Sequence, residues 1–421
     1  MKNIFIPLIV SLVLSIACNA QTYTGPIPKP LSGYGSDGSF LVDTSHFLNP
    51  DYPSQASIII YPQGVSSPVP TMFFCHGGGA NQALYYQGLF KFIAQKGYAV
   101  VFVPYSNSIG INDRYELMKT GFSYAADNFS FIDTTQVGFI GHSFGGGMSI
   151  AIGYHFMNTR NWGSNGRFLM PIAQFYSFQL TQADLLNYPS DVKLLSIIYD
   201  DDNVNDHRMA IDIFNNINIP DTEKDIVYIK SSTVGSYAYL ADHNAIATHN
   251  YFDALDYYAV YRLLDAMMDY VFNGNILAKD ICLGDGNAIQ TSMPSGMEQL
   301  IVTDTLTSWR HPETYFGNAC SSPSNPRAAY CNSIATSLEQ TEILNQYDLF
   351  PNPSTDYWHI LASNGIESIS VYNLSGANVE SIENIEGINF KIDISDYPKG
   401  IYVVAVNDSK GNLLVLKGLK L

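Results

Sequence analysis

The chain has 421 residues, of which 46% are hydrophobic and 14% charged, and its formal net charge at pH 7 is −17. This length accommodates one large domain and a smaller one, and the composition is that of a globular protein. The negative charge argues against nucleic acid and anionic membrane surfaces as partners, because both repel an acidic protein. We expect a monomer.

The first 20 residues have the pattern of a signal peptide. Lys2 gives a short positive start, an apolar run covers 4–17, and Cys18-Asn19-Ala20 provides a cleavage site. This apolar run is shorter than the ~20 residues that a membrane span needs, and no other run approaches that length. A lipoprotein acylated at Cys18 is an alternative, since Ile16-Ala17-Cys18 fits the end of that signal. We expect a soluble, exported protein with no transmembrane segment in its mature chain.

Four cysteines remain after the signal peptide. Cys75 ends an apolar strand and is expected to be a buried free thiol. Cys282, Cys320 and Cys331 fall in one loop-rich region, and an exported protein reaches a compartment that permits disulfides. One bridge among the three is expected. Cys320–Cys331 closes the shortest loop, but the sequence leaves the pairing open.

Strand and helix patterns alternate from residue 39 to residue 272. Continuous apolar runs such as 98–104 indicate strands that are buried on both faces. Such alternation predicts an α/β fold with a mostly parallel sheet and right-handed crossovers. The expected strands are 39–42, 56–61, 71–75, 98–104, 137–140, 168–175, 192–199 and 225–230. The expected helices are 86–95, 113–127, 145–157, 207–216 and 251–272.

The stretch 137–147 joins a buried strand to the start of a helix. Its segment Gly141-His142-Ser143-Phe144-Gly145 is a G-x-S-x-G motif, in which a sharp turn presents a serine hydroxyl at the top of a sheet. Glycine is needed on both sides because the turn is strained and the strand packs closely on the helix. The first turn of the helix offers unpaired N–H groups to a developing oxyanion. The motif predicts Ser143 as a nucleophile.

A second glycine-rich segment, His76-Gly77-Gly78-Gly79, follows the expected strand 71–75. Glycine lets the backbone approach a substrate oxygen with no side chain in the way. Glycine-rich turns after strands also occur without a function. The order of this loop and the later G-x-S-x-G motif favours a role for the loop in binding an oxyanion.

An activated serine needs a base, and that base needs an acid to fix its tautomer. When a triad follows the chain order serine, acid, histidine, the acid is expected just after the second strand beyond the serine. That strand, 192–199, ends in Asp200-Asp201-Asp202. We predict Asp202 from its D-x-V pattern. Asp200 and Asp201 remain alternatives, and a solvated acidic loop or a cation site is the competing interpretation.

The base is expected in the loop after the last strand, 225–230. His243 lies in a loop before the last helix, and His249 is placed more like the flank of that helix. His207 comes too early, at the start of the preceding helix. We predict His243 as the base, and we expect His76 and His142 to orient loops rather than to transfer protons.

Together these residues resemble the α/β-hydrolase superfamily, near the dienelactone hydrolases, lipases and polyester hydrolases, over about residues 35–275. The resemblance implies Ser143 as nucleophile, Asp202 as acid and His243 as base. It also implies oxyanion donors in the Phe144 amide and an amide of 77–79, with Gly78 the first choice, and no metal or organic cofactor. Polyester hydrolases place an aromatic residue at the loop position and often Met after the serine, whereas this chain has Gly78 and Phe144.

Several residues are candidates to contact a substrate. Gly79 belongs to the glycine-rich loop, and tyrosines near this loop or near His243 could line a cleft. They suit an aryl or acyl ester, and equally a carbohydrate ester. The four tyrosines are Tyr85, Tyr86, Tyr237 and Tyr239.

The alternation of strands and helices ends near residue 275. We expect a signal peptide at 1–20, a catalytic domain at 21–275, and an irregular extension of that domain at 276–335 that contains cysteines. A separate minidomain at 276–335 is the alternative. A polar linker at 336–345 and a C-terminal domain at 346–421 follow.

Short alternating strands with regular turn residues predict a small all-β sandwich at 346–421. The segments FPNPS at 350–354, VYNLSG at 371–376 and PKGIYVVAV at 398–406 resemble the C-terminal sorting domain of proteins exported by the type IX secretion system of Bacteroidetes. The resemblance implies secretion across the outer membrane, with the type IX machinery as a partner of this domain.

We therefore expect a secreted serine hydrolase that cleaves carboxylic esters, including polyesters among its candidate substrates. A peptidase of the same fold is one alternative, because a Ser-His-Asp triad does not distinguish esters from amides. A catalytically inactive binding protein is another. A surface adhesin is suggested by the sorting domain alone.

Overall fold

The computed structural model describes residues 22–247, 251–303, 312–331, 347–362, 365–385, 387–410 and 413–421. The expected signal peptide with Cys18, the linker at 336–345 and the alternative base His249 lie outside these residues. The chain divides after Cys331 into two compact units. Each is described by itself.

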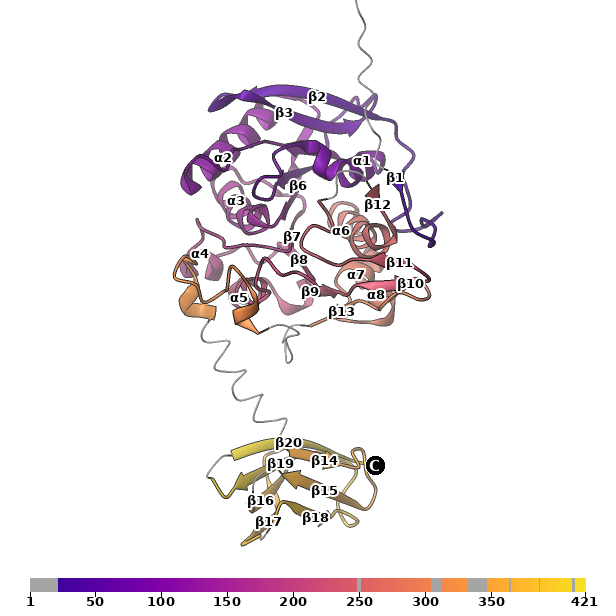
Figure 1. The fold of residues 1–421 in the computed structure, drawn as a ribbon, viewed down its shortest axis with the longest axis vertical. Coiled ribbons are helices and arrows are strands. Elements are labelled where there is room, and N and C mark those ends of the chain that lie inside the picture. Colours follow the sequence, from indigo (N-terminus) through magenta and orange to yellow (C-terminus); the bar gives the residue numbers. More distant parts are fainter. Residues whose placement is uncertain are drawn as a thin grey trace, which may run out of the picture. The chain divides into compact units, whose positions relative to one another are not determined.

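A mixed sheet forms the centre of the first unit (Figure 1). Within the described residues it has nine strands in the order β13-β9-β8-β7-β6-β4-β5-β3-β2. Neighbours from β5 to β9 run parallel, whereas β2, β3 and β13 are antiparallel to their neighbours. The strands are β2 (Val42–Asn49), β3 (Tyr52–Pro62), β4 (Val69–Cys75), β5 (Ala99–Phe102), β6 (Ile132–His142), β7 (Arg167–Ile172), β8 (Lys193–Tyr199), β9 (Lys224–Ile229) and β13 (Ile301–Val302).

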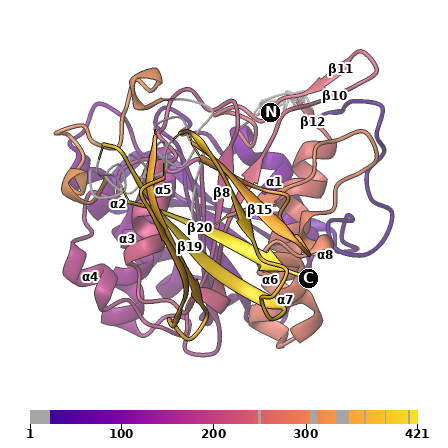
Figure 2. The same ribbon diagram turned by 90° about the horizontal axis from the view of Figure 1, so that it is seen from below.

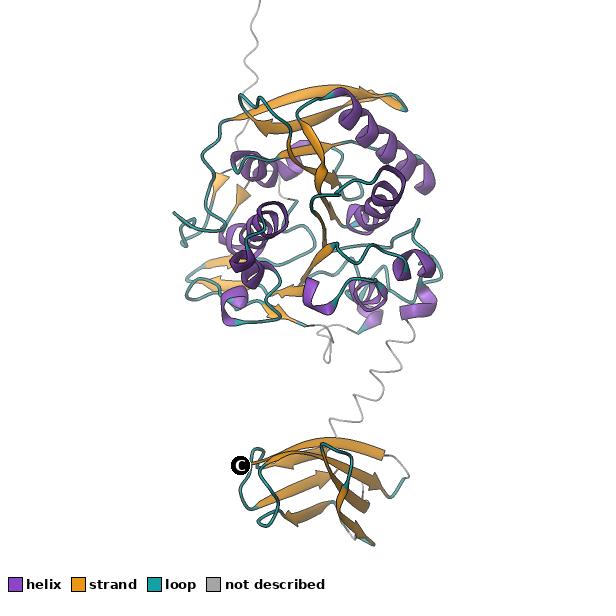
Figure 3. Cartoon of the chain, turned by 180° about the vertical axis from the view of Figure 1, so that it is seen from behind, coloured by secondary structure: helices purple, strands orange, loops and turns teal. Residues whose placement is uncertain are grey.

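Helices cover both faces of this sheet (Figure 3). The central parallel strands are buried along almost their whole length, as apolar strands between two helical layers must be. Helices α1 and α6 lie on one face, and α2 and α3 on the other (Figure 1). The helices are α1 (Gln87–Gln95), α2 (Ile111–Asn128), α3 (Phe144–Arg160), α4 (Gln182–Leu186), α5 (Arg208–Asn216), α6 (Arg262–Asn273), α7 (Ile276–Cys282) and α8 (Ala288–Thr291).

Two sequence expectations about elements are wrong. The first strand is 42–49 rather than 39–42, and β3 begins at Tyr52 and includes Pro53, because an edge hairpin tolerates polar residues and proline. The expected helix 251–272 begins instead with β12 (Tyr251–Phe252), which pairs with β1 (Thr22–Tyr23). A π-helical segment, Asp256–Tyr261, then leads into α6.

The chain after α6 is more regular than its composition suggests. It contributes α7, α8 and the edge strand β13, which pairs with β9 of the main sheet. Residues 312–331 contain the disulfide Cys320–Cys331, whereas Cys75 and Cys282 are buried free thiols. A short hairpin, β10 (Ser232–Val234) and β11 (Tyr237–Tyr239), projects from this unit (Figure 2).

The second unit consists of two small antiparallel sheets, in the orders β14-β15-β18 and β17-β16-β19-β20. Their inner faces share one core, in which Trp358 and Ile392 of the first sheet pack with Val371 and Val404 of the second. This is a β-sandwich arrangement. The strands are β14 (Tyr347–Phe350), β15 (Tyr357–Ala362), β16 (Ile366–Asn373), β17 (Asn378–Glu383), β18 (Asn389–Asp393), β19 (Gly400–Asp408) and β20 (Leu413–Lys420).

Candidate active site

The loops that follow β4, β6, β8 and β9 meet at one edge of the main sheet. Parallel strands end at the same edge, so loops that are far apart in the sequence converge there. The loop after β4 holds the glycine-rich segment, and Ser143 directly follows β6. The loop after β8 holds Asp202, and His243 follows β9 and the β10–β11 hairpin.

Ser143 occupies a strained turn between β6 and α3. Its φ of 56° and ψ of −122° are unfavourable for a residue with a side chain. The flanking glycines make the turn possible. A Cβ atom on Gly141 would lie 2.1 Å from the carbonyl oxygen of Gly145, and one on Gly145 would lie 2.0 Å from that of Cys75. The G-x-S-x-G pattern thus follows from close packing of strand against helix.

Three side chains form a continuous hydrogen-bonded chain. His243 Nε2 lies 2.9 Å from Ser143 Oγ, and His243 Nδ1 lies 2.8 Å from Asp202 Oδ2. Since a carboxylate can only accept, Nδ1 carries the proton, and Nε2 is left to accept from the serine hydroxyl. Asp202 is fully buried, and His243 is 7% exposed. Ser143, Asp202 and His243, all three predicted from the sequence, therefore lie together in the arrangement of a nucleophile, an acid and a base.

The surroundings of Asp202 keep it ionised. Burial raises the pKa of this carboxyl, but the hydrogen bond and charge of His243 and two backbone N–H groups outweigh burial and hold the pKa below its usual value. These N–H groups belong to Val204 and Asn205 and bind Oδ1 at 2.8 and 3.0 Å. The alternative acids have other partners, since Tyr228 donates to Asp200 and Ser231 donates to Asp201.

The glycine-rich loop lies against Ser143. A Cβ atom on Gly77 would be 3.3 Å from Ser143 Cβ, and the side chain of Asn107 lies beside Gly78 and Gly79. Among the described residues, the amide nitrogens of Gly78 and Phe144 donate to no other group. Two unused N–H groups, one from this loop and one from the first residue of α3, are therefore available to bind an oxyanion next to Ser143.

His142 connects three parts of the site. Its Nε2 lies 2.7 Å from the carbonyl oxygen of His243, and its Nδ1 lies 3.0 Å from Tyr86 Oη. The Tyr86 hydroxyl also accepts a hydrogen bond from the Gly77 amide. Burial, and then the charge of His243, lower the pKa of His142 to about 3. A neutral ring has one N–H, which must be at Nε2 because the His243 carbonyl can only accept.

His76 is also a buried, neutral histidine. Its Nδ1 lies 2.7 Å from the Gly77 carbonyl oxygen, and its Nε2 accepts from the Tyr105 amide at 3.0 Å. The ring stacks on that of Tyr105, with centroids 3.8 Å apart. Burial lowers the pKa of His76 to about 3. His76 therefore fixes the course of the glycine-rich loop as a neutral ring.

Sequence reasoning missed Asn205. Its Nδ2 donates to the Ala173 carbonyl oxygen at 2.8 Å and lies 3.5 Å from Ser143 Oγ. The side chain is 2% exposed, and its Oδ1 has no hydrogen-bond partner among the described residues. The backbone of Asn205 forms an isolated β-bridge with that of Asn318, which belongs to the segment 312–331. An asparagine in a loop gives no signal in the sequence, so only the fold brings it to the serine.

Most of the tyrosines proposed to contact a substrate lie elsewhere. Tyr239 is fully buried, and its hydroxyl accepts from the Ile27 amide, so this residue packs against the N-terminal segment instead of lining a cleft. Tyr237 is half-buried and binds Thr24 and Asp253. Tyr86 acts within the His142 network described above, and Tyr85 is half-buried against the core.

Aromatic residues pack around Phe144, which directly follows Ser143. The ring of Phe144 packs with those of Phe175 and Phe178, with centroids 6.2 and 5.9 Å apart, and with that of Tyr105. The Arg114 guanidinium lies 5.1 Å from the centre of the Phe144 ring. The described residues include no group of three or more His, Cys, Asp and Glu side chains placed to hold a metal ion.

Comparison with known proteins identifies one part of the chain. Residues 348–417 match the family of secretion system C-terminal sorting domains. A search of curated proteins finds no match. In the part of the chain that the structure describes, no helix is long and apolar enough to cross a membrane. The second unit is a type IX sorting domain, and the protein is secreted.

Proposed function

We propose that this secreted protein is a serine hydrolase that cleaves carboxylic esters through an acyl-enzyme intermediate. The observation that carries the proposal is the hydrogen-bonded chain from Asp202 through His243 to Ser143. The order of these residues along the chain, acid after serine and histidine last, is that of α/β-hydrolases. A mixed sheet covered by helices on both faces, with the serine on a strand-to-helix turn, supports that fold.

The proposed reaction begins with attack of Ser143 Oγ on the ester carbonyl carbon. His243 Nε2 takes the hydroxyl proton as the bond forms, and buried Asp202 stabilises the resulting imidazolium. The tetrahedral intermediate collapses when His243 returns that proton to the leaving alkoxide, so that an alcohol departs. A water molecule then attacks the acyl-serine with His243 again as base, and this step releases the acid.

The negative charge on the former carbonyl oxygen needs donors already in position. The amides of Gly78 and Phe144 are the proposed donors, because they lie on the two segments that flank Ser143 and have no other hydrogen-bond partner among the described residues. Donors fixed by a loop and by a helix start need no reorganisation during the reaction. Removing one such donor in other enzymes costs about 100- to 1000-fold in kcat.

The test is hydrolysis of p-nitrophenyl acetate, butyrate and octanoate by the full chain and by its Ser143→Ala variant. We expect activity in the unchanged protein and a loss of several orders of magnitude in the variant. Ser149→Ala is a matched control, because this serine is buried in α3 and its hydroxyl bonds, among the residues that the structure describes, only to the Gly146 carbonyl oxygen. A folded protein that hydrolyses none of these esters, or a Ser143→Ala variant that remains active, would overturn the proposal. If the esters are hydrolysed, the change in rate from acetate to octanoate indicates the size of the site that binds the acyl chain.

A further inference from the structure

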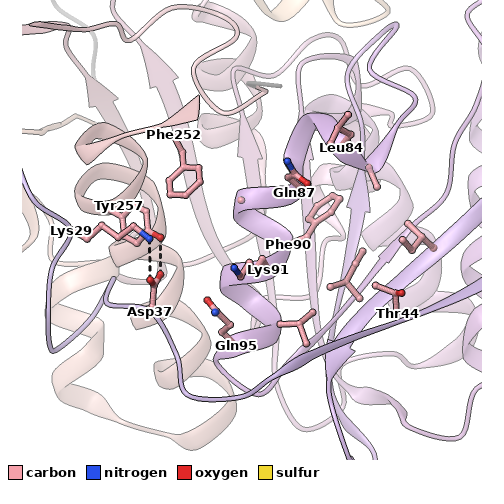
Figure 4. A pocket seen from close by; sticks show the side chains of 15 residues that line it. Lys29, Asp37, Thr44, Leu84, Gln87, Phe90, Lys91, Gln95, Phe252 and Tyr257 are labelled. Atoms are coloured by element: carbon pink, nitrogen blue, oxygen red, sulfur yellow. Dashed lines mark hydrogen bonds and ion pairs between the residues drawn. The ribbon is translucent and has the colours of Figure 1, made fainter. Parts of the chain in front are cut away.

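A cavity lies apart from the residues around Ser143. It has a volume of about 510 Å³, is partly open to solvent, and is lined by α1, the β2–β3 edge of the sheet, the N-terminal segment and the start of the π-helical segment (Figure 4). Small-molecule sites in proteins commonly have volumes of about 300–1,000 Å³. None of the residues that line this cavity takes part in the catalytic chain, the glycine-rich loop or the His142 network.

Most of the cavity wall is apolar. Ile58 and Ile60 of β3 contribute to the lining. Phe90 of α1 and Phe252 lie on different sides of the space (Figure 4). Ile60 and Phe90 belong to the buried core, so this part of the wall is held in place by packing behind it. An alkyl chain placed here would be removed from water on several sides.

Charged side chains gather at one end of the cavity. Lys29 Nζ is 3.1 Å from Asp37 Oδ2, and Tyr257 donates to Asp37 Oδ1 at 2.7 Å. Lys29 also lies 5.0 Å from the ring centre of Phe252 and 4.9 Å from that of Tyr257. Each carboxylate oxygen of Asp37 therefore has one partner within the protein, and the side chain remains 43% exposed.

Lys91 is the second lysine that lines the cavity. It projects from α1 towards the same end of the cavity (Figure 4), and it makes no ion pair or hydrogen bond with any described residue. Burial raises the pKa of Asp37, but the bonds from Tyr257 and Lys29 and the charges of Lys29 and Lys91 leave it lower than usual, so Lys91 lies within electrostatic reach. Two lysines and one aspartate give this end a net positive charge in a chain whose net charge is −17.

We propose that this cavity binds an amphipathic carboxylate, with its alkyl chain between β3 and Phe252 and its carboxylate at Lys91. The apolar wall and the solvent-exposed ammonium group of Lys91 border one half-open cavity, which suits a ligand with an apolar body and one anionic head. A wholly apolar ligand would leave Lys91 unused. The site does not depend on the hydrolase reaction, and its test is made on the Ser143→Ala variant, which excludes turnover.

The experiment measures binding of hexanoate, octanoate and decanoate to the full-length Ser143→Ala protein by titration calorimetry. We expect one site and an affinity that rises about fourfold for each added methylene until the cavity is full. Lys91→Glu is expected to weaken octanoate binding by about tenfold or more, because attraction becomes repulsion. The neutral analogue 1-octanol should bind the two proteins equally well.

Two further variants locate the site. Thr44→Trp places a large side chain at the cavity wall from the edge strand β2, and it should abolish binding of both octanoate and 1-octanol. Lys417→Glu makes the same change in net charge on β20 of the sorting domain, and it should leave binding unchanged. Absence of saturable binding, binding that Thr44→Trp does not alter, or octanoate binding that Lys91→Glu does not weaken would each overturn the proposal. The proposal would also be overturned if the protein self-associated, if octanoate did not prevent this, and if Thr44→Trp abolished it. The occupant of the cavity would then be a second copy of the protein.

Discussion

His142 Nε2 donates a hydrogen bond to the backbone carbonyl oxygen of His243, across a distance of 2.7 Å. The residue before the proposed nucleophile Ser143 therefore holds the main chain of the proposed base, His243. Its other nitrogen accepts from Tyr86, whose hydroxyl accepts from the amide of Gly77. The glycine-rich loop, the serine turn and the histidine loop are joined by one chain of hydrogen bonds, which couples the positions of all three.

Replacing His142 should lower the rate of the proposed reaction more than it weakens substrate binding. In His142→Phe the carbonyl of His243 loses its donor, and the base is expected to shift relative to Ser143. A displacement of about 1 Å can cost up to roughly 100-fold in rate, so we expect kcat to fall within that range while KM changes little. His142→Gln is the conservative control, because its amide can reach the same carbonyl oxygen and should restore most of kcat.

The measurement is kcat and KM for p-nitrophenyl butyrate, with circular dichroism to show that both variants fold. If His142→Phe and His142→Gln lost the same activity, the hydrogen bond to His243 would not be the cause. A rise in KM with unchanged kcat would place His142 in substrate binding instead.

The two buried histidines predict a loss of stability in acid. His76 and His142 have pKa values lowered from 6.5 to about 3 by burial. A histidine whose pKa is depressed by folding contributes its full stability above about pH 6.5, and this contribution is lost as the pH falls towards 3. The free energy of unfolding should decrease in that interval by up to about 1.4 kcal/mol per pH unit for each histidine.

Urea unfolding at pH 7, 5.5 and 4 measures this effect. His142→Gln removes one of the two titrating groups and should lessen the pH dependence by about one proton. Because His142 lies in the first unit, the unfolding transition that responds to this substitution is that of the first unit. Equal pH dependence of the two proteins would contradict the prediction.

Asp225 predicts the opposite dependence on pH. It lies at the start of β9, where its Oδ2 accepts from Gln290 Nε2 at 2.7 Å and from the Asp285 amide at 3.2 Å. Burial raises its pKa to about 6, more than these two bonds lower it. A carboxyl with a raised pKa contributes stability when it is protonated, and this contribution is lost as the pH rises through about 6.

Asp225→Asn should therefore stabilise the protein at pH 8 by about 1–3 kcal/mol, because the amide carries no buried charge. The advantage should shrink below pH 6 and vanish near pH 4. Thermal unfolding of both proteins across this range is the measurement. Destabilisation at pH 8 would show that the charge strengthens the bonds from Gln290 and Asp285 by more than its burial costs.

The sequence predicted those site residues that a local pattern or a strand order determines. Gly141, Ser143 and Gly145 follow from the steric needs of one turn, and Asp202 and His243 follow from their places after particular strands. Asn205 could not be found in this way. Its contact with the Ala173 carbonyl depends on how the loops after β7 and β8 meet, and neither loop has a distinctive composition.

The sequence also did not predict which tyrosine side chains are buried. Tyr239 and Tyr85 are of one residue type and were both expected near a cleft, yet Tyr239 is fully enclosed and Tyr85 is not. A phenol ring suits a core whenever its hydroxyl finds a partner, and for Tyr239 this partner is the Ile27 amide, 212 residues away in the chain. The edge strand β2 was expected at 39–42 and lies at 42–49, where most of its side chains are not buried and leave no clear apolar pattern.

Asn205 should prove important for catalysis. Its Nδ2 is 3.5 Å from Ser143 Oγ and is held there by the bond to Ala173. Asn205→Ala should cost about 1 kcal/mol of stability for the lost hydrogen bond and lower kcat by about 10- to 100-fold through displacement of the serine and of the Asp202 loop. Asn218→Ala is the matched control, because its Nδ2 makes a similar bond to the Tyr188 carbonyl oxygen. Equal kcat losses in the two variants would remove any special role for Asn205.

The disulfide Cys320–Cys331 should support the catalytic loop as well as the fold. The Cys320 amide donates to Asp206 Oδ2 at 3.0 Å, and Asn318 bridges Asn205, so the bridged segment holds the loop that carries Asp202. Closing a loop of 11 residues is worth about 3 kcal/mol in the chain-entropy view. Replacing both cysteines with serine should therefore destabilise the protein by about that amount.

The same double replacement should lower kcat of the proposed esterase, since Asp202 must keep His243 in the reactive tautomer and orientation. Dithiothreitol should reproduce the loss in the unchanged protein and have no effect on the double variant, because the thiols of Cys75 and Cys282 are already free and buried. Thermal unfolding and kcat are measured with and without the reductant. A double variant that is less stable but fully active would limit the bridge to stabilising the fold, whereas a loss of kcat at temperatures where the variant is still folded would show that residues 312–331 hold the acid in place.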